Sequence, residues 1–113
     1  SRKQNKRLGA YFVSLNICGK MEIMENLEII ASGRVQGVGY RFFVSRMANI
    51  HKITGYVRNM ENGNVKIIAC SESENMIIFL AELRKGPSFA EVLDLKISEI
   101  TSIKTYGTFT IEY

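Results

Sequence analysis

The sequence contains too few cysteines and histidines to suggest a disulfide framework or a zinc site. Its two cysteines, Cys18 and Cys70, form no CxxC pair, and His51 is the only histidine. Disulfide-stabilised domains and zinc sites both require larger, closely spaced sets of these residues. We therefore expect a reduced, cytoplasmic protein that binds no metal or cofactor, and we interpret His51 as an ordinary residue near a helix end.

Long hydrophobic runs are also absent. Charged or strongly polar residues interrupt every apolar stretch before it reaches the roughly 20 residues that a transmembrane helix needs. A length of 113 residues with 46% hydrophobic residues suits one compact domain. We expect a soluble, monomeric protein without a membrane partner.

Excess positive charge is absent from most of the chain. The formal net charge is +4, and residues 1–26 carry +3 of it, which leaves residues 27–113 nearly neutral. Nucleic-acid-binding domains usually concentrate basic residues on one surface. The charge distribution therefore argues against a nucleic-acid partner.

The first 25 residues show no clear folding pattern. A basic cluster precedes an apolar stretch, but Asn16 interrupts that stretch and no small-x-small cleavage site follows, so a signal peptide is not indicated. We interpret residues 1–25 as an extension that is cloning-derived, upstream of the natural start or disordered, with Met21 or Met24 as candidate starts. An extra strand from Tyr11 to Ile17 is the alternative. The domain itself is expected over residues 26–113.

From Leu27 the hydrophobic pattern becomes regular. A short strand from Leu27 to Ala31 is predicted to lead into a glycine-containing loop, and a helix is predicted from about Arg41 to Lys52. Spacings of i, i+4 and i+7 place one apolar face on this helix, formed by Phe43, Met47 and Ile50.

A hairpin and a second helix are predicted next. Strands from Thr54 to Met60 and from Val65 to Cys70 flank Asn62-Gly63, a strong hairpin signal. Ser73 is predicted to cap a helix that ends at Gly86-Pro87. The apolar face of this helix is expected to contain Met76, Phe79, Leu80 and Leu83.

Two further alternating stretches complete the pattern. Leu93, Leu95 and Ile97 predict a half-buried strand, and Phe109, Ile111 and Tyr113 predict a short last one. The order β-α-β-β-α-β is typical of the α+β, ferredoxin-like sandwich, a mostly antiparallel sheet with two helices on one face.

The loop from Ser32 to Arg41 (SGRVQGVGYR) is the first candidate site. Gly37 and Gly39 allow backbone torsions that turn consecutive N–H groups towards one point, and that point lies at a predicted helix N-terminus. Free amides and the positive end of the helix dipole favour an anion there. Arg41 adds a planar fork for two phosphate oxygens. The loop lacks both nucleotide-binding glycine motifs, so on its own it predicts an anion site or an ordinary glycine turn.

A second motif, Gly55-Tyr-Val-Arg-Asn59, occurs in the strand after the first helix. If the first two strands are neighbours in the sheet, Asn59 lies near the loop. Together, Gly33-Arg-Val-Gln-Gly-Val-Gly-Tyr-Arg41 and this second motif resemble the two motifs of the acylphosphatase family, and Phe109 to Tyr113 resembles its usual ending. The resemblance covers about residues 26–113, with tyrosine at 56 where many relatives have tryptophan.

The resemblance implies hydrolysis of the carboxyl–phosphate bond of small acyl phosphates, without a metal or cofactor. It places phosphate binding on the loop amides and the Arg41 guanidinium, and the orientation of the attacking water on Asn59. The substrate's own phosphate is expected to accept the proton. The phosphate-binding residues would be Gln36, Gly37, Val38, Gly39, Tyr40 and Arg41.

Two other functions have partial support in the sequence. Residues 39–44 faintly resemble an aromatic RNA-binding motif, but they are predicted to begin a helix and present an arginine where a small residue is needed. An accessory domain like the one at the start of hydrogenase maturation proteins is the second alternative. The sequence contains no zinc-finger cysteines after this domain, which favours a free-standing enzyme.

Overall fold

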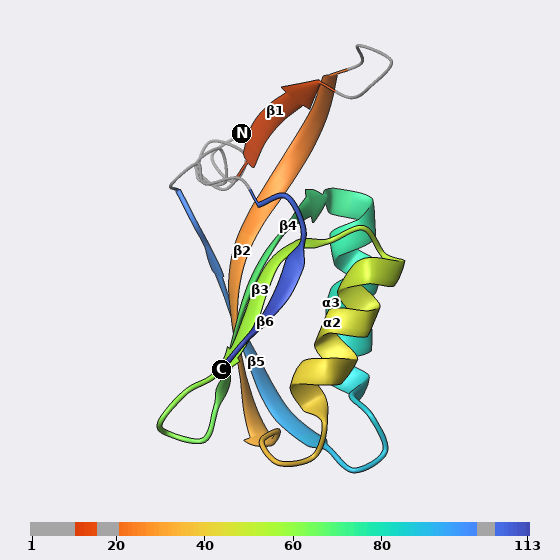
Figure 1. The fold of residues 1–113 in the computed structure, drawn as a ribbon. Coiled ribbons are helices and arrows are strands. Elements are labelled where there is room, and N and C mark those ends of the chain that lie inside the picture. The colour runs from red at the N-terminus through yellow and green to blue at the C-terminus, as the bar shows by residue number, and fades with distance from the viewer. Residues whose placement is uncertain (1–10, 16–20, 102–105) are drawn as a thin grey trace.

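The computed structural model describes residues 11–15, 21–101 and 106–113. In this part of the chain, six strands form one mixed sheet, and two helices cover one face of it (Figure 1). The predicted α+β, ferredoxin-like fold is confirmed. In chain order the elements are β1 (Tyr11–Leu15), β2 (Met21–Arg34), α2 (Tyr40–Ile50), β3 (Thr54–Asn59), β4 (Val65–Glu72), α3 (Ser73–Lys85), β5 (Glu91–Glu99) and β6 (Phe109–Glu112).

The strand order corrects one expectation about the site. The sheet runs β1-β2-β4-β3-β6, so β4 separates β2 from β3, and the expectation that these two strands are neighbours is wrong. Because β4 is antiparallel to both, β2 and β3 run in the same direction and finish at the same end of the sheet. Ala31 and Asn59 both pair with Val65, which puts them about two strand spacings, or roughly 10 Å, apart.

The second strand is longer than predicted. It begins at Met21 rather than Leu27, and its first residues pair with β1, while its later residues pair with β5. Since β4 occupies the other side of β2, β1 and β5 follow one another along the same edge. The strand over Tyr11–Leu15 falls within the alternative of an extra strand, whereas residues 1–10 and 16–20 of the predicted extension lie outside the described part.

The buried face of α2 differs from the predicted one. Its buried residues are Tyr40, Val44, Met47 and Ala48, whereas Phe43 is only partly buried and Ile50 is exposed. The apolar spacing was read from Phe43 instead of Tyr40, which shifted the expected face around the helix. His51 caps the helix end through its backbone N–H, as expected for an ordinary residue at that place.

Helix α3 buries three of the four predicted residues, Met76, Phe79 and Leu83, and it ends before Gly86 as expected. Ser73 is not its cap: the N-cap is Glu72, no side chain caps the helix, and β4 runs directly into it. Neither helix in the described part of the chain has the length and apolar character needed to cross a membrane.

The alternation expected in β5 is only partly present. Leu95 is buried, but Leu93 is 72% exposed and Ile97 is 37% exposed. The register of pairing between β5 and β2 shifts at Ser32/Gly33, so Leu93 lies between two paired positions. Its side chain therefore departs from the alternation that would direct it towards the core. Ile97 lies on an edge strand, where the helices cover less of the sheet.

The core lies between the sheet and the two helices. Phe79 of α3 meets Phe109 of β6 edge to face, with 6.4 Å between the ring centroids. Cys70 is buried on β4, and burial raises the pKa of its thiol, which therefore remains uncharged at neutral pH. The largest completely buried side chains are Tyr40, Phe79, Ile29, Ile67, Met76, Leu83, Val35, Val44, Val57 and Val65.

Gly55, in β3, is expected to be essential for stability. Its φ is 137°, and a Cβ atom there would lie 1.9 Å from the Ile68 carbonyl oxygen on β4. We expect Gly55→Ala to lower the free energy of unfolding by about 2–4 kcal/mol in urea titration, because the two strands must separate locally. Gly63→Ala is the control: its φ is also positive, but the new Cβ meets nothing within 4 Å. A loss for Gly55→Ala no larger than for Gly63→Ala would contradict this account.

Candidate active site

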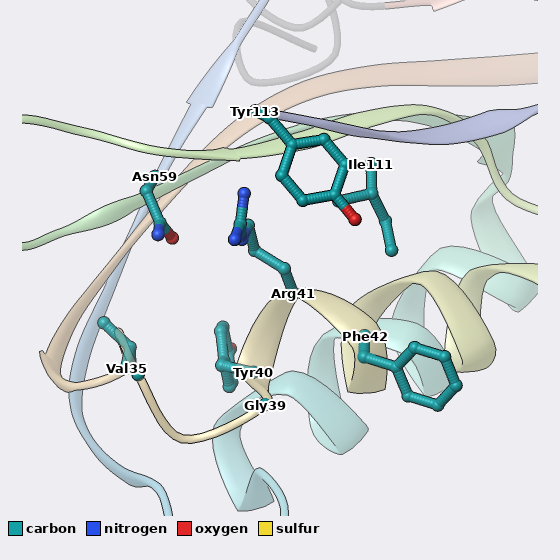
Figure 2. A pocket seen from close by; sticks show the side chains of 9 residues that line it. Val35, Gly39, Tyr40, Arg41, Phe42, Asn59, Ile111 and Tyr113 are labelled. Carbon is teal, nitrogen blue, oxygen red and sulfur yellow. The ribbon is translucent and has the colours of Figure 1, made fainter.

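A pocket of about 180 Å³ opens where the N-terminus of α2 faces the ends of β3 and β6. Figure 2 shows that its walls come from three segments far apart in the sequence: the loop between β2 and α2, the end of β3, and the C-terminal residues of the chain. The lining residues are Val35, Gly37, Gly39, Tyr40, Arg41, Phe42, Asn59, Ile111 and Tyr113.

The backbone at the start of α2 is arranged to attract an anion. Gly37 and Gly39 have φ of 73° and 77°, left-handed values that glycine adopts without strain. Gly39 is the N-cap and no side chain caps the helix. The amides of the first helical turn have no intrahelical acceptor, and the helix dipole adds partial positive charge beside the pocket. An anion of phosphate size is the natural ligand for such an end.

Arg41 projects from the first turn of α2 into this pocket. Its Nη1 donates a hydrogen bond of 2.9 Å to the Glu112 carbonyl, and its Cζ lies 4.7 Å from the centre of the Tyr113 ring. In Figure 2 the guanidinium lies between Tyr113 and Asn59. A guanidinium has five N–H donors, so this arrangement fixes its direction and leaves donors for a ligand.

Asn59 is the last residue of β3, and its side chain is exposed to the pocket. Figure 2 shows its amide directed towards the Arg41 guanidinium. Arg41 and Asn59 therefore line the same pocket, as predicted, although β2 and β3 are not the neighbouring strands that were expected. Strand β3 ends at the same end of the sheet as β2, and α2 then passes over β3 and β6.

The other predicted phosphate-binding residues divide into two groups. Gly37, Gly39 and Tyr40 line the pocket with Arg41, whereas Gln36 and Val38 do not. Val38 packs against the core. The side chain of Gln36 bonds to the β3–β4 hairpin instead.

Tyr40 is one of the lining residues, but its side chain is buried. The hydroxyl donates a 3.0 Å hydrogen bond to the Leu83 carbonyl near the end of α3. Burial raises the pKa of Tyr40 above its usual value, so the phenol remains neutral and acts as a hydrogen-bond donor. It therefore anchors the start of α2 rather than serving as an acid or base.

Within the described residues, no three His, Cys, Asp or Glu side chains lie together in a way that could hold a metal ion. The pocket lining itself includes no carboxylate and no imidazole side chain. Apart from the buried Tyr40, the lining residues with polar side chains are Arg41, Asn59 and Tyr113. Such a site suits charge neutralisation and positioning.

The C-terminal residues were not predicted as part of the site, although the alternating strand there was recognised. Nothing in the pattern from Phe109 to Tyr113 signals contact with Arg41, since that contact depends on β6 pairing in parallel with β3. The Tyr113 ring lies over the guanidinium, and such a contact favours the observed arginine position.

We expect Tyr113→Ala to raise KM for an acyl phosphate about threefold, because Arg41 then samples more orientations. Tyr113→Phe keeps the ring over the guanidinium and should leave KM unchanged. Steady-state kinetics of the two variants checks this, and an equal rise of KM in both would show that the hydroxyl rather than the ring matters.

Comparison with known proteins shows the family of this chain. The sequence profile of the acylphosphatase family matches residues 27–111. The chain belongs to the acylphosphatase family. It is 42% identical over 90 residues to an acylphosphatase from Bacillus velezensis and 44% identical over 88 residues to one from Pseudothermotoga lettingae. These matches cover 80% and 78% of this chain, and 100% and 98% of the relatives.

Solved structures agree with this family assignment. The crystal structure of acylphosphatase from Bacillus subtilis superposes with a TM-score of 0.76 at 34% identity, covering 80% of this chain and 99% of that one. Full-length HypF in the phosphate- and nucleotide-bound form also matches, with a TM-score of 0.71 and 26% identity, but only 12% of that chain is covered. The fold of this acylphosphatase-family domain therefore occurs both as a whole protein and as part of a larger one.

Proposed function

We propose that the pocket at the start of α2 binds the phosphoryl group of an acyl phosphate, with Arg41 gripping its oxygens and Asn59 orienting the attacking water. As a member of the acylphosphatase family, the protein is a hydrolase that acts on small acyl phosphates. The observation that supports the two roles is the convergence of Arg41 and Asn59 on one pocket beside an uncapped helix N-terminus.

The chemistry suits this limited set of groups. An acyl phosphate carries a good leaving group, so the site must mainly align the reactants and stabilise charge on the phosphoryl oxygens. The loop amides of Gly37, Gly39 and Tyr40 and the Arg41 guanidinium supply that stabilisation. The Asn59 side-chain amide holds water on one side of phosphorus. In-line attack then directs the acyl group away from Asn59, towards Ile111 and Tyr113 (Figure 2).

The substrate's own phosphate is the proposed proton acceptor. No carboxylate or histidine side chain lines the described pocket, and Tyr40 is held neutral by burial. The pH dependence of the rate should therefore follow the phosphate pKa of the substrate and shift between substrates of different phosphate pKa. A profile that follows one protein side chain regardless of substrate would contradict this step.

Several expectations accompany the proposal. They are a monomeric state, a cytoplasmic location, independence from metals and cofactors, and the absence of a nucleic-acid or membrane partner. Size-exclusion chromatography with light scattering tests the first of these directly.

The enzyme claim is tested by release of inorganic phosphate from benzoyl phosphate in the presence and absence of a chelator. We expect the same rate, well above the uncatalysed one, in both conditions. A folded protein with no activity would contradict hydrolysis, whereas loss of activity on chelation would contradict metal independence alone.

The match to HypF favours a second candidate function, a phosphate-binding accessory domain without catalysis of its own. The relatives matched over nearly their whole length favour catalysis. The two candidates differ in the same assay, because an accessory domain would bind phosphate without turning over benzoyl phosphate.

A further inference from the structure

Gln36 connects the loop between β2 and α2 to the hairpin that follows Asn59, and it does not line the pocket. Its Nε2 donates hydrogen bonds of 2.8 Å to the Met60 carbonyl and 2.8 Å to the Asn64 carbonyl. Both acceptors belong to the hairpin between β3 and β4, and Met60 directly follows Asn59. The loop between β2 and α2 (residues 35–39, the phosphate loop) and this hairpin lie at the same end of the sheet (Figure 1).

The two bonds match the chemistry of the amide. A glutamine NH₂ group has two hydrogens, and each finds one carbonyl oxygen. The same two carbonyls also accept from the hairpin itself: Met60 N–H donates to Asn64 O at 2.8 Å and Gly63 N–H donates to Met60 O at 3.2 Å. Gln36 therefore binds a turn that has its own backbone hydrogen bonds and begins one residue after Asn59.

We propose that Gln36 is a positioning residue that fixes Asn59 relative to the phosphate loop. The inference rests on the proposed function of Asn59. Strand β4 separates β3 from β2, so Asn59 is not paired directly with the strand that leads into the loop and is joined to it only through β4. The Gln36 side chain supplies a direct link across that gap. It acts on the water-orienting group through the hairpin, while the loop amides and Arg41 keep their own supports in the glycine torsions and the Glu112 carbonyl.

Gln36→Met tests this, because methionine has the same length and no donor. We expect kcat for benzoyl phosphate to fall by about 10- to 100-fold, since a displacement of roughly 1 Å can cost about 100-fold in rate. Inhibition by inorganic phosphate should change less than about threefold, because phosphate contacts do not include the Gln36 side chain. Glu61→Met, an exposed residue of the same hairpin, is the control and should leave kcat unchanged.

The decisive comparison is Gln36→Met in an Asn59→Ala background. If Gln36 acts through Asn59, the second substitution has almost no further effect, whereas independent roles would multiply their losses. Multiplied losses, or an unchanged kcat with weakened phosphate inhibition, would overturn the proposal. If Asn59→Ala alone leaves the rate unchanged, the proposed function of Asn59 fails instead. Urea titration of each variant shows whether it is folded under assay conditions.

Discussion

Replacing Arg41 by glutamine is expected to reduce kcat/KM for benzoyl phosphate by about 100- to 1,000-fold, the usual loss for a donor that stabilises transition-state charge. The guanidinium is the one cationic side chain that lines the described pocket, and its direction is fixed by the Glu112 carbonyl and the Tyr113 ring. Glutamine keeps part of the side-chain length but removes the positive charge and the bidentate hydrogen bonding to phosphate. Inhibition by inorganic phosphate should weaken together with the rate, because Arg41 holds the phosphoryl group before and during reaction.

Arg46→Gln is the matched control for Arg41→Gln. Arg46 lies on the same helix, is exposed, and does not line the pocket. The substitution removes the same charge, so a general electrostatic effect would appear in both variants. We expect only Arg41→Gln to lose activity, and comparable losses in the two would contradict a specific contact between Arg41 and phosphate.

Asn59→Ala is expected to produce a different pattern, a fall of kcat by about 100-fold or more with little change in phosphate inhibition. The side chain lies at the end of β3 and faces the pocket from the side opposite the C-terminal residues. Its proposed partner is the attacking water, which matters in the reaction but not in binding the anion. Steady-state kinetics together with competitive inhibition by inorganic phosphate separates the two effects.

Asn49→Ala serves as the control for Asn59→Ala, because it removes the same amide from an exposed position on α2 outside the pocket. Its kinetics should equal those of the wild type. If Asn59→Ala weakens phosphate inhibition as strongly as it lowers kcat, then Asn59 binds the phosphoryl group, and its assignment to water is wrong.

The sequence predicted the fold class well because its main signals are local. The Asn62-Gly63 turn, the glycine stop after α3 and the apolar spacing of Met76, Phe79 and Leu83 each determine structure within a few residues. The buried face of α2 was misassigned because Phe43 and Tyr40 both fit a helical repeat, and only packing distinguishes them.

Features that depend on pairing between segments far apart in the sequence were harder to predict. The separation of β2 from β3 by β4, and the bulge that turns Leu93 outward, follow from the sheet arrangement and not from any short pattern. The prediction of the site was incomplete for the same reason. Arg41 and Asn59 were predicted from their motifs. The bond from Gln36 to the hairpin and the contacts of Arg41 with the C-terminal residues join segments far apart in sequence, so no motif predicted them.

In the proposed reaction, Asn59 orients water for attack on phosphorus while Arg41 holds the phosphoryl group. Hydrolysis of benzoyl phosphate in ¹⁸O-labelled water tests this directly, because the label marks the atom that water attacks. After subtraction of the uncatalysed reaction, we expect the enzyme to place the label in inorganic phosphate. Label in benzoate would show attack on the carbonyl carbon and would contradict the proposed arrangement.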